Sequence, residues 1–174
     1  MYSCLQRANT LSSLFSSVIL GLCALIAASS WLFSADPSAS VQVQAINVYH
    51  ARTHYHHTAQ EFMRVNFDLE ADLTSLFNWN TKQLFIYVVA SYPGSKYHAN
   101  DVVIWDKIIK SKQRAKFSAP NLKEKYKVAD IAGSWANRNA TFSLQWNVMP
   151  QTGLLVWGSS QGTTPILLPR PKQK

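Results

Sequence analysis

Apolar and polar side chains alternate with a period of two along much of this chain. The clearest stretch is FMRVNFDLEADL, in which every second residue from Met63 to Ala71 is apolar and the residues between them are polar. Such alternation is typical of a β-strand with one face in a core and the other in water, as in an antiparallel sheet. Phe67 lies in the middle of the apolar face, so we expect it to anchor the core.

Other stretches predict further strands. In VQVQAI, residues 41–46, positions 41, 43 and 45 fall on one side of a first strand and position 46 falls on the other. The run LFIYVVASY, residues 84–92, is almost continuously apolar and ends at Pro93-Gly94, which predicts a strand buried on both faces. The run VVIWDKII, residues 102–109, predicts the next strand.

The last pair of strands is predicted as a hairpin. From Thr141 to Val148 the even-numbered residues are apolar, the segment 150–153 contains proline and glycine, and LLVWG follows as the returning strand. We expect Trp146, on the apolar face, to anchor the core with Phe67. The one helical or irregular candidate is ADLTSLFNWNTKQ, whose Trp79 we expect at the edge of the core.

Short strands separated by turn residues predict the fold class. A parallel α/β sheet would need helical crossovers, and no helical periodicity joins the predicted strands. We therefore expect an all-β domain at residues 34–174, an antiparallel β-sandwich, preceded by one N-terminal transmembrane helix.

The segment from Leu11 to Phe33 has no charged side chain, and its 23 residues are enough to cross a hydrocarbon core of about 30 Å. The part up to Ala28 also matches a secretory signal, because small residues follow it at a possible cleavage site. Trp31 extends the apolar run past these small residues, which favours an uncleaved anchor over residues 11–33. Cleavage remains the alternative.

The charges beside this segment predict its orientation. Arg7 precedes it and Asp36 follows it, so the positive-inside bias places residues 1–10 in the cytosol and the domain in the lumen of the endoplasmic reticulum. The sequon Asn139-Ala140-Thr141 predicts N-glycosylation at Asn139, which requires that lumenal side. The predicted localisation is the endoplasmic reticulum membrane, as a single-pass type II protein.

Composition adds two constraints. Among the 174 residues, the two cysteines are Cys4 and Cys23, so the predicted domain must fold without disulfides, which its size permits. The net charge of +8 is carried by the domain, with a basic cluster between Lys107 and Lys127. We interpret the cluster as a solvated loop and strand face, with docking or lipid headgroups as the alternative. A lumenal domain would not meet nucleic acid.

Histidines are the most conspicuous candidate metal ligands. His50, His54, His56 and His57 lie close together, but on a strand His57 would oppose the two before it, and no cysteine or acid before Glu61 completes a ligand set. A connecting loop explains this composition equally well. We expect no physiological metal here.

Catalytic signatures are absent from the sequence. It contains no G-x-S-x-G elbow, H-E-x-x-H helix or glycine-rich phosphate loop, and a pair such as Ser91 and His98 would arise by chance. Asp68, Glu70 and Asp72 share the wet face of one predicted strand, so we interpret them as solubilising edge charges rather than as a general acid and base. We expect no catalytic residue and no cofactor.

Several of these runs together resemble subunit 3 of the eukaryotic signal peptidase complex, its small glycoprotein subunit. The matching runs cover most of the chain: RANTL, FDLEADLTSLFNWNTKQLFIYV, VVIWDKII, KEKYKV and NRNATFSLQWNVMPQTGLL. The segment between Val48 and Glu61 and the tail PRPKQK do not match. The glycosylation position of the family falls on Asn139, and its architecture agrees with the anchor and sandwich predicted above.

The resemblance implies a function. It implies a non-catalytic accessory subunit that supports a separate serine-protease subunit in removing N-terminal signal peptides from secretory precursors at the lumenal membrane face. The catalytic serine would lie in that other chain, and the implied partners are the catalytic and other subunits of the complex and the endoplasmic reticulum membrane.

Two other classes are compatible with the residues alone. A secreted or membrane-anchored β-sandwich that binds carbohydrate or protein would, in its secreted form, have lost the N-terminal segment by cleavage. A hydrolase in its own right would need a nucleophile whose loss abolishes the activity of the isolated domain.

Overall fold

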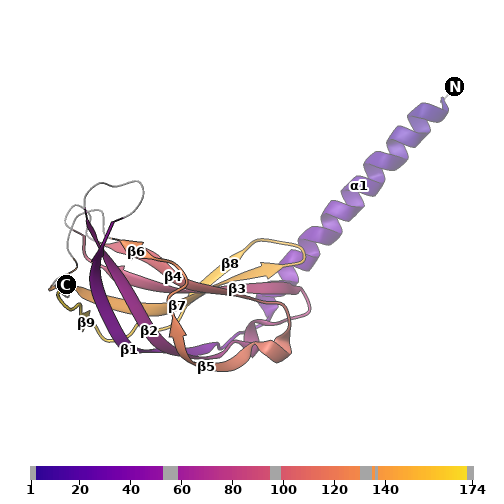
Figure 1. Cartoon of the computed structure of the whole chain (residues 1–174). Helices are drawn as coiled ribbons and strands as arrows, with labels where there is room; N and C mark the ends of the chain where they lie inside the picture. The colour runs from indigo at the N-terminus through magenta and orange to yellow at the C-terminus, as the bar shows by residue number, and fades with distance from the viewer. Residues whose placement is uncertain (1–2, 53–58, 95–98, 130–134, 136, 172–174) are drawn as a thin grey trace.

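A computed structural model describes residues 3–52, 59–94, 99–129, 135 and 137–171 of the chain. In it a long helix leads into a sandwich of two antiparallel sheets, and the helix projects from one end of the sandwich (Figure 1). The predicted fold class, an antiparallel β-sandwich behind one apolar helix that is long enough to cross a membrane, is therefore confirmed.

The helix α1 spans Cys4–Ser29 and continues as a 3-10 turn, Ser30–Leu32. The Ser3 hydroxyl caps its start by accepting a hydrogen bond from the backbone N–H of Gln6. Its large apolar side chains are exposed, and the helix is long and apolar enough to cross a membrane. The helix begins earlier than the predicted membrane segment, at Cys4.

The first sheet has the strand order β1-β2-β5, with β6 pairing to β2 beyond the end of β5. Its strands are β1 (Ser38–Ala51), β2 (Gln60–Asp72), β5 (Lys116–Lys123) and β6 (Val128–Ala129). Two short 3-10 turns, Thr74–Leu76 and Lys112–Arg114, follow β2 and β4. The alternation predicted for β2 is confirmed, because Met63, Val65, Phe67, Leu69 and Ala71 are all buried.

The second sheet has the strand order β4-β3-β7-β8, with β9 pairing to the start of β7. Its strands are β3 (Thr81–Tyr92), β4 (Asn100–Ile109), β7 (Asn139–Pro150), β8 (Val156–Ser159) and β9 (Ile166–Leu167). The predicted hairpin corresponds to β7 and β8, in which Trp146 pairs with Gly158.

The core lies between the two sheets. The aromatic ring of Phe67, which is fully buried, meets the ring of Trp105 edge to face at 6.3 Å across the interface. Trp146 is also buried, so both expected anchors belong to the core. This joins apolar faces of both sheets in a single core without any disulfide.

Three details differ from the sequence-based prediction. A bulge between Val43 and Ala45 shifts the phase of β1, so Ile46 packs against the core and Ala45 is exposed. The strand β3 is buried along its inner face but only in part along its outer face, where Val89 is 2% exposed and Phe85 and Tyr87 are half-buried. Trp79, expected at the edge of the core, is 60% exposed.

Candidate functional site

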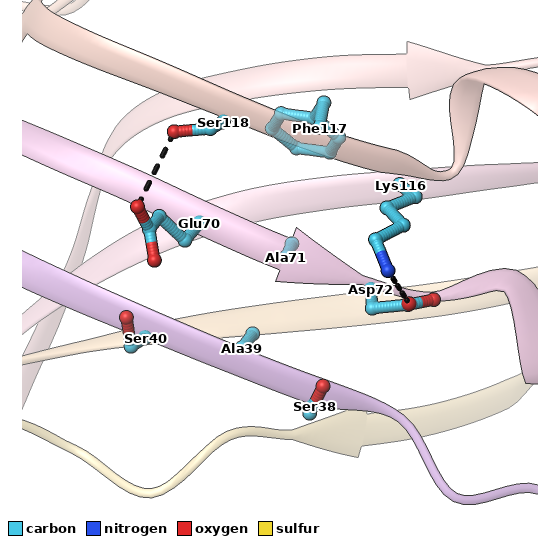
Figure 2. A pocket seen from close by; sticks show the side chains of 9 residues that line it. All are labelled: Ser38, Ala39, Ser40, Glu70, Ala71, Asp72, Lys116, Phe117 and Ser118. Carbon is cyan, nitrogen blue, oxygen red and sulfur yellow. Dashed lines mark hydrogen bonds and ion pairs between the residues drawn. The ribbon is translucent and has the colours of Figure 1, made fainter.

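A shallow hollow of about 530 Å³ lies on the outer face of the β1-β2-β5 sheet (Figure 2). Short segments of the three strands line it, and its polar side chains project from all three. Within it the Ser118 hydroxyl donates to Glu70 Oε1 at 3.4 Å, and Lys116 Nζ lies 3.2 Å from Asp72 Oδ2. Because a hydroxyl, an amine and two carboxylates line it, we consider this hollow as a candidate catalytic site.

The electrostatics of the hollow indicate stabilisation rather than catalysis. The Thr74 hydroxyl, the Thr74 backbone N–H and the Lys116 ammonium all hold the pKa of Asp72 below its ordinary value of 3.8. Asp72 is therefore a stable carboxylate rather than a proton carrier near neutral pH. Ser118 faces only a solvent-exposed carboxylate, whereas a nucleophilic serine needs a stronger base beside it.

The three predicted carboxylates lie on one face of β2, as expected, but they are not edge charges. β2 is an interior strand between β1 and β5, so its outer side chains bind side chains and backbone of both neighbouring strands. Asp68, for example, accepts hydrogen bonds from Gln44 Nε2 on β1 at 2.6 Å and from the backbone N–H of Asn121 on β5 at 2.7 Å. The acids therefore tie the strands of the sheet together.

The predicted histidine and serine positions fall only partly within the described residues. His50 is exposed near the end of β1, whereas His54, His56 and His57 lie outside the described residues, as does His98. No group of three or more metal-binding side chains occurs among the residues that the structure describes. The backbone carbonyl of Ser91 accepts a hydrogen bond from the Thr141 hydroxyl at 3.5 Å.

The basic cluster runs from the end of β4 through the β4–β5 connection and β5 to the segment that follows β5. Its side chains are all exposed: Lys107, Lys110, Lys112, Arg114, Lys116, Lys123, Lys125 and Lys127. Some already have partners: Lys107 Nζ lies over the Phe117 ring at 4.7 Å, and Lys116 pairs with Asp72. Their exposure is compatible both with a solvated loop and strand face and with the alternative of docking or lipid headgroups.

The segment Glu124–Tyr126 joins the two sheets along one side of the sandwich. On the side of the first sheet, the backbone N–H of Glu124 donates to the Val65 carbonyl at 3.1 Å. On the side of the second, the backbone N–H of Lys125 donates to the Ile104 carbonyl at 2.8 Å. We call this segment the edge clasp.

Side chains reinforce the edge clasp. Lys125 Nζ at 2.7 Å and the Tyr126 hydroxyl at 2.6 Å both donate to Asp106 Oδ1. These two donors hold the pKa of Asp106 below its ordinary value, and the carboxylate in turn raises the pKa of Lys125. In the sequence Lys125 is recognisable only as part of the basic cluster, because its partner Asp106 lies on β4, 19 residues earlier.

A buried polar junction at the end of the helix was not foreseen. The Asn80 side chain, 1% exposed, donates to Ser30 Oγ at 2.9 Å and to the Thr152 carbonyl at 2.8 Å, and its Oδ1 accepts from the Thr152 N–H at 3.1 Å. The Asn80 carbonyl accepts from the Gln151 N–H at 2.6 Å. One asparagine thus connects the helix end, the start of β3 and the β7–β8 turn. An asparagine between two strands signals a turn, but not its long-range partners.

The buried carboxylate of Glu61 was also missed as a structural group. Glu61, 8% exposed, accepts a hydrogen bond from the backbone N–H of Trp135 at 2.8 Å, and the Glu61 carbonyl accepts from Trp135 Nε1 at 3.0 Å. The indole packs against the Tyr92 ring with centroids 4.6 Å apart. Glu61 therefore anchors Trp135 in the core.

Asn139, the predicted glycosylation residue, is the first residue of β7 and is exposed. It pairs with Leu167 of β9 at the end of the sandwich that lies away from α1 (Figure 1). A glycan there would project into solvent without contacting the helix.

Comparison with known proteins gives a consistent family. Residues 1–171 match the family model described as signal peptidase subunit. A protein of Schizosaccharomyces pombe named signal peptidase complex subunit 3 is 32% identical over 171 residues, which cover 92% of this chain and 91% of the relative.

Shorter alignments reach higher identity. A protein of the same name from Debaryomyces hansenii is 50% identical over 102 residues, 58% of this chain and 54% of the relative. The human protein of that name is 41% identical over 105 residues, 59% of this chain and 58% of the relative. These matched stretches span little more than half the length of the two relatives.

Proposed function

The chain belongs to the signal peptidase subunit family, and on this premise we propose that it is a non-catalytic accessory subunit of the signal peptidase complex. In this role it supports the removal of N-terminal signal peptides from secretory precursors at the lumenal face of the endoplasmic reticulum membrane. The observation that carries the proposal is the family match over residues 1–171, which includes both the apolar helix and the sandwich.

We further propose that the catalytic serine lies in another chain of the complex. The ionisable groups of the outer hollow support this: Lys116 pairs with Asp72, and Ser118 lies beside a solvent-exposed carboxylate. A serine nucleophile needs a base that is itself held and oriented by a third group, whereas these exposed side chains pair across neighbouring strands of the sheet. The function of such a chain is to hold and orient partners, namely the catalytic and other subunits.

In the proposed topology, residues 1–10 are cytosolic, residues 11–33 cross the endoplasmic reticulum membrane and residues 34–174 form the lumenal domain. Contacts at the junction favour an uncleaved helix. Cys23, Ile26, Ala27 and Ser30, spaced along one helical face, are half-buried, and Ser30 binds the buried Asn80. Cleavage after the small residues would remove this face and leave part of the Asn80 carboxamide unpaired.

Affinity purification from detergent-solubilised microsomes tests the assembly. A tagged copy of the chain is expected to co-purify with a serine-protease subunit, and depletion of the chain is expected to cause unprocessed secretory precursors to accumulate. Normal processing after complete depletion, or purification without any protease subunit, would refute the proposed function.

Treatment with endoglycosidase H tests the topology. The band of the wild-type chain should shift by one glycan, whereas N139Q should migrate at the deglycosylated position before and after treatment. This follows because Asn139 carries the one sequon of the sequence and is exposed. An unshifted wild-type band would place the domain on the cytosolic side.

A further inference from the structure

The tip of the β7–β8 hairpin exposes a cluster of large apolar side chains. Leu154 is 82% exposed, Leu155 44%, Val156 52% and Trp157 65%. Four consecutive exposed apolar residues are unusual on a water-facing turn, where such a patch marks a surface that is covered in the working protein. We call residues 154–157 the hairpin tip.

The position of the hairpin tip relative to α1 identifies what covers it. Gly153, at the start of the tip, adopts φ +126° and lies against Ala27: a Cβ added to Gly153 would be 3.1 Å from Ala27 Cβ. Ala27 precedes Leu32, the last residue of the apolar span, by five residues. At the rise per residue of an α-helix or 3-10 helix, the contact therefore lies roughly 8 Å along the helix axis from that end of the span. The end of the hairpin therefore lies beside the last turns of α1 rather than short of the end of the helix (Figure 1).

A second contact region agrees with this depth. Leu154 and Val156 line a hollow of about 580 Å³ together with Ala24 and Ala28, both from the last two turns of α1. The small side chains of these alanines leave room for the larger side chains of the tip. A segment that lies at the level of Ala24 lies within the stretch of helix that must be surrounded by acyl chains if α1 crosses a bilayer.

Asn80 pairs backbone polar groups of Gln151 and Thr152, the residues of the turn that precede the tip. Asn80 satisfies the N–H and the carbonyl of Thr152 through its side chain and the N–H of Gln151 through its own carbonyl. In hydrocarbon an unpaired backbone group is costly, and non-helical backbone is tolerated there only where protein groups satisfy it. The paired groups of Gln151 and Thr152 are therefore compatible with an apolar environment beside α1.

Exposed aromatic residues mark the expected membrane surface. Trp31, at the end of the apolar helix, is 83% exposed, and Trp79, beside the buried Asn80, is 60% exposed. Tryptophan favours the headgroup level of a bilayer, where its ring is apolar and its N–H meets water. This gives the otherwise unexplained exposure of Trp79 a physical reason.

We propose that the hairpin tip, residues 154–157, inserts into the lumenal leaflet of the bilayer as a second, non-spanning membrane contact beside α1. The inference rests on the proposed anchoring of the chain by α1. Its consequence is that the sandwich is held at a fixed height and tilt above the membrane by two attachments, the helix and the hairpin tip, rather than by a single flexible tether.

Lipid-quenching fluorescence tests the inference. In a C4S/C23A background, single cysteines L154C, L14C and S118C are each labelled with an environment-sensitive fluorophore in the full-length chain. The labelled chains are reconstituted into phosphatidylcholine vesicles with or without nitroxide on the acyl chains. Both leucines are exposed in the isolated fold, so their replacement removes few internal contacts.

The expected result is blue-shifted, strongly quenched emission for L154C and L14C and no quenching for S118C, which reports the exposed outer sheet. Quenching of L14C but not of L154C would overturn the inference and leave the anchoring by α1 intact. Absence of quenching at L14C would refute the anchoring itself, and the inference with it.

Covering by protein is a distinct outcome of the same experiment. If L154C is blue-shifted but unquenched, a protein surface covers the tip and the inference is wrong. The measurement is therefore repeated with the chain in its co-purified complex, where loss of quenching would assign the tip to a helix of another subunit. W157C serves as a second reporter, and agreement between the two positions excludes an effect of one substitution.

Discussion

Asn80 shows how one side chain can set the geometry of the whole molecule. Its carboxamide uses both donor and acceptor atoms, toward Ser30 on one side and Thr152 on the other. Buried amides of this kind are stabilising only when their partners are all present, because an unpaired buried polar group costs about 1 to 3 kcal/mol. The stability of the fold should therefore depend on the hydrogen-bonding groups of the side chain at position 80 more than on its size.

Replacing Asn80 by aspartate tests this sensitivity. The isosteric N80D variant keeps the acceptors but loses both donors and introduces a buried charge, so we expect it to lower the free energy of unfolding by at least about 2 kcal/mol. N78D is the matched control, because Asn78 Oδ1 acts as an acceptor for the Asn80 N–H and the Thr81 hydroxyl. Chemical denaturation in detergent measures both, and equal stabilities of the two variants would contradict the assigned role of Asn80.

Gly158 matters through space rather than through backbone freedom. It pairs with Trp146, and a Cβ at Gly158 would lie 2.7 Å from Cε2 of the indole. We expect G158A to cost about 1 to 3 kcal/mol, as overpacking of a filled core does. In G162A the added Cβ would meet its nearest atom at 3.8 Å, an ordinary contact, so its melting temperature should stay close to that of the wild type. A wild-type melting temperature for G158A would mean that the indole can move aside.

At the scale of elements, strong local patterns predicted well and long-range constraints did not. The alternation in β2 and β7 correctly identified Phe67 and Trp146 because a half-buried strand repeats every two residues. β5 was not predicted, since KFSAPNLK carries charge and a proline that are tolerated on an edge strand. The phase of β1 was wrong beyond its bulge, which depends on pairing with β2 rather than on local composition.

The edge clasp predicts a specific pH dependence. The lowered pKa of Asp106 means that its ionised form stabilises the fold above the ordinary aspartate value of 3.8, and that this contribution is lost as the pH falls through the lowered native pKa. D106N should therefore be less stable than the wild type at neutral pH, and the difference in melting temperature should shrink under acid conditions.

The control for the clasp is D101N, an exposed substitution on the same strand. Melting curves recorded from neutral to strongly acidic pH should show a wild-type-like profile for D101N. A difference between D106N and the wild type that is independent of pH would show that the carboxylate acts through packing rather than through its charge.

At the scale of the whole molecule, the helix and the sandwich were each predictable, but their connection was not. The apolar length of the helix and the spacing of the strands are local properties, whereas the contacts of Gly153 with Ala27 and of Asn80 with Ser30 join residues far apart in the sequence. The sequon at Asn139 is likewise a local motif and gives a prediction of glycosylation, whereas the burial of Glu61 and Asn80 depends on residues far away in the sequence. Single-sequence reasoning identifies elements and motifs, and the docking of elements emerges only in the fold.

The accessory role makes a prediction about every polar side chain of the domain, and the outer hollow is the most demanding place to test it. Ser118, Lys116 and Glu70 combine a hydroxyl, an amine and a carboxylate in one hollow (Figure 2). If the chain is not catalytic, S118A and K116M should each support processing of secretory precursors within about tenfold of the wild-type rate, because loss of a true nucleophile or base removes several orders of magnitude.

Assembly must be measured beside activity in this experiment. A substitution that destabilises the sandwich lowers the amount of intact complex and imitates a catalytic defect, so precursor processing is normalised to the co-purified protease subunit. Both substitutions lie at exposed positions, where changes usually alter stability only slightly. If S118A assembled at the normal level but processed precursors about a thousandfold more slowly, its loss would match that of a nucleophile. The hydroxyl would then belong to the reacting centre, and the division of labour between this chain and a separate protease subunit would be wrong.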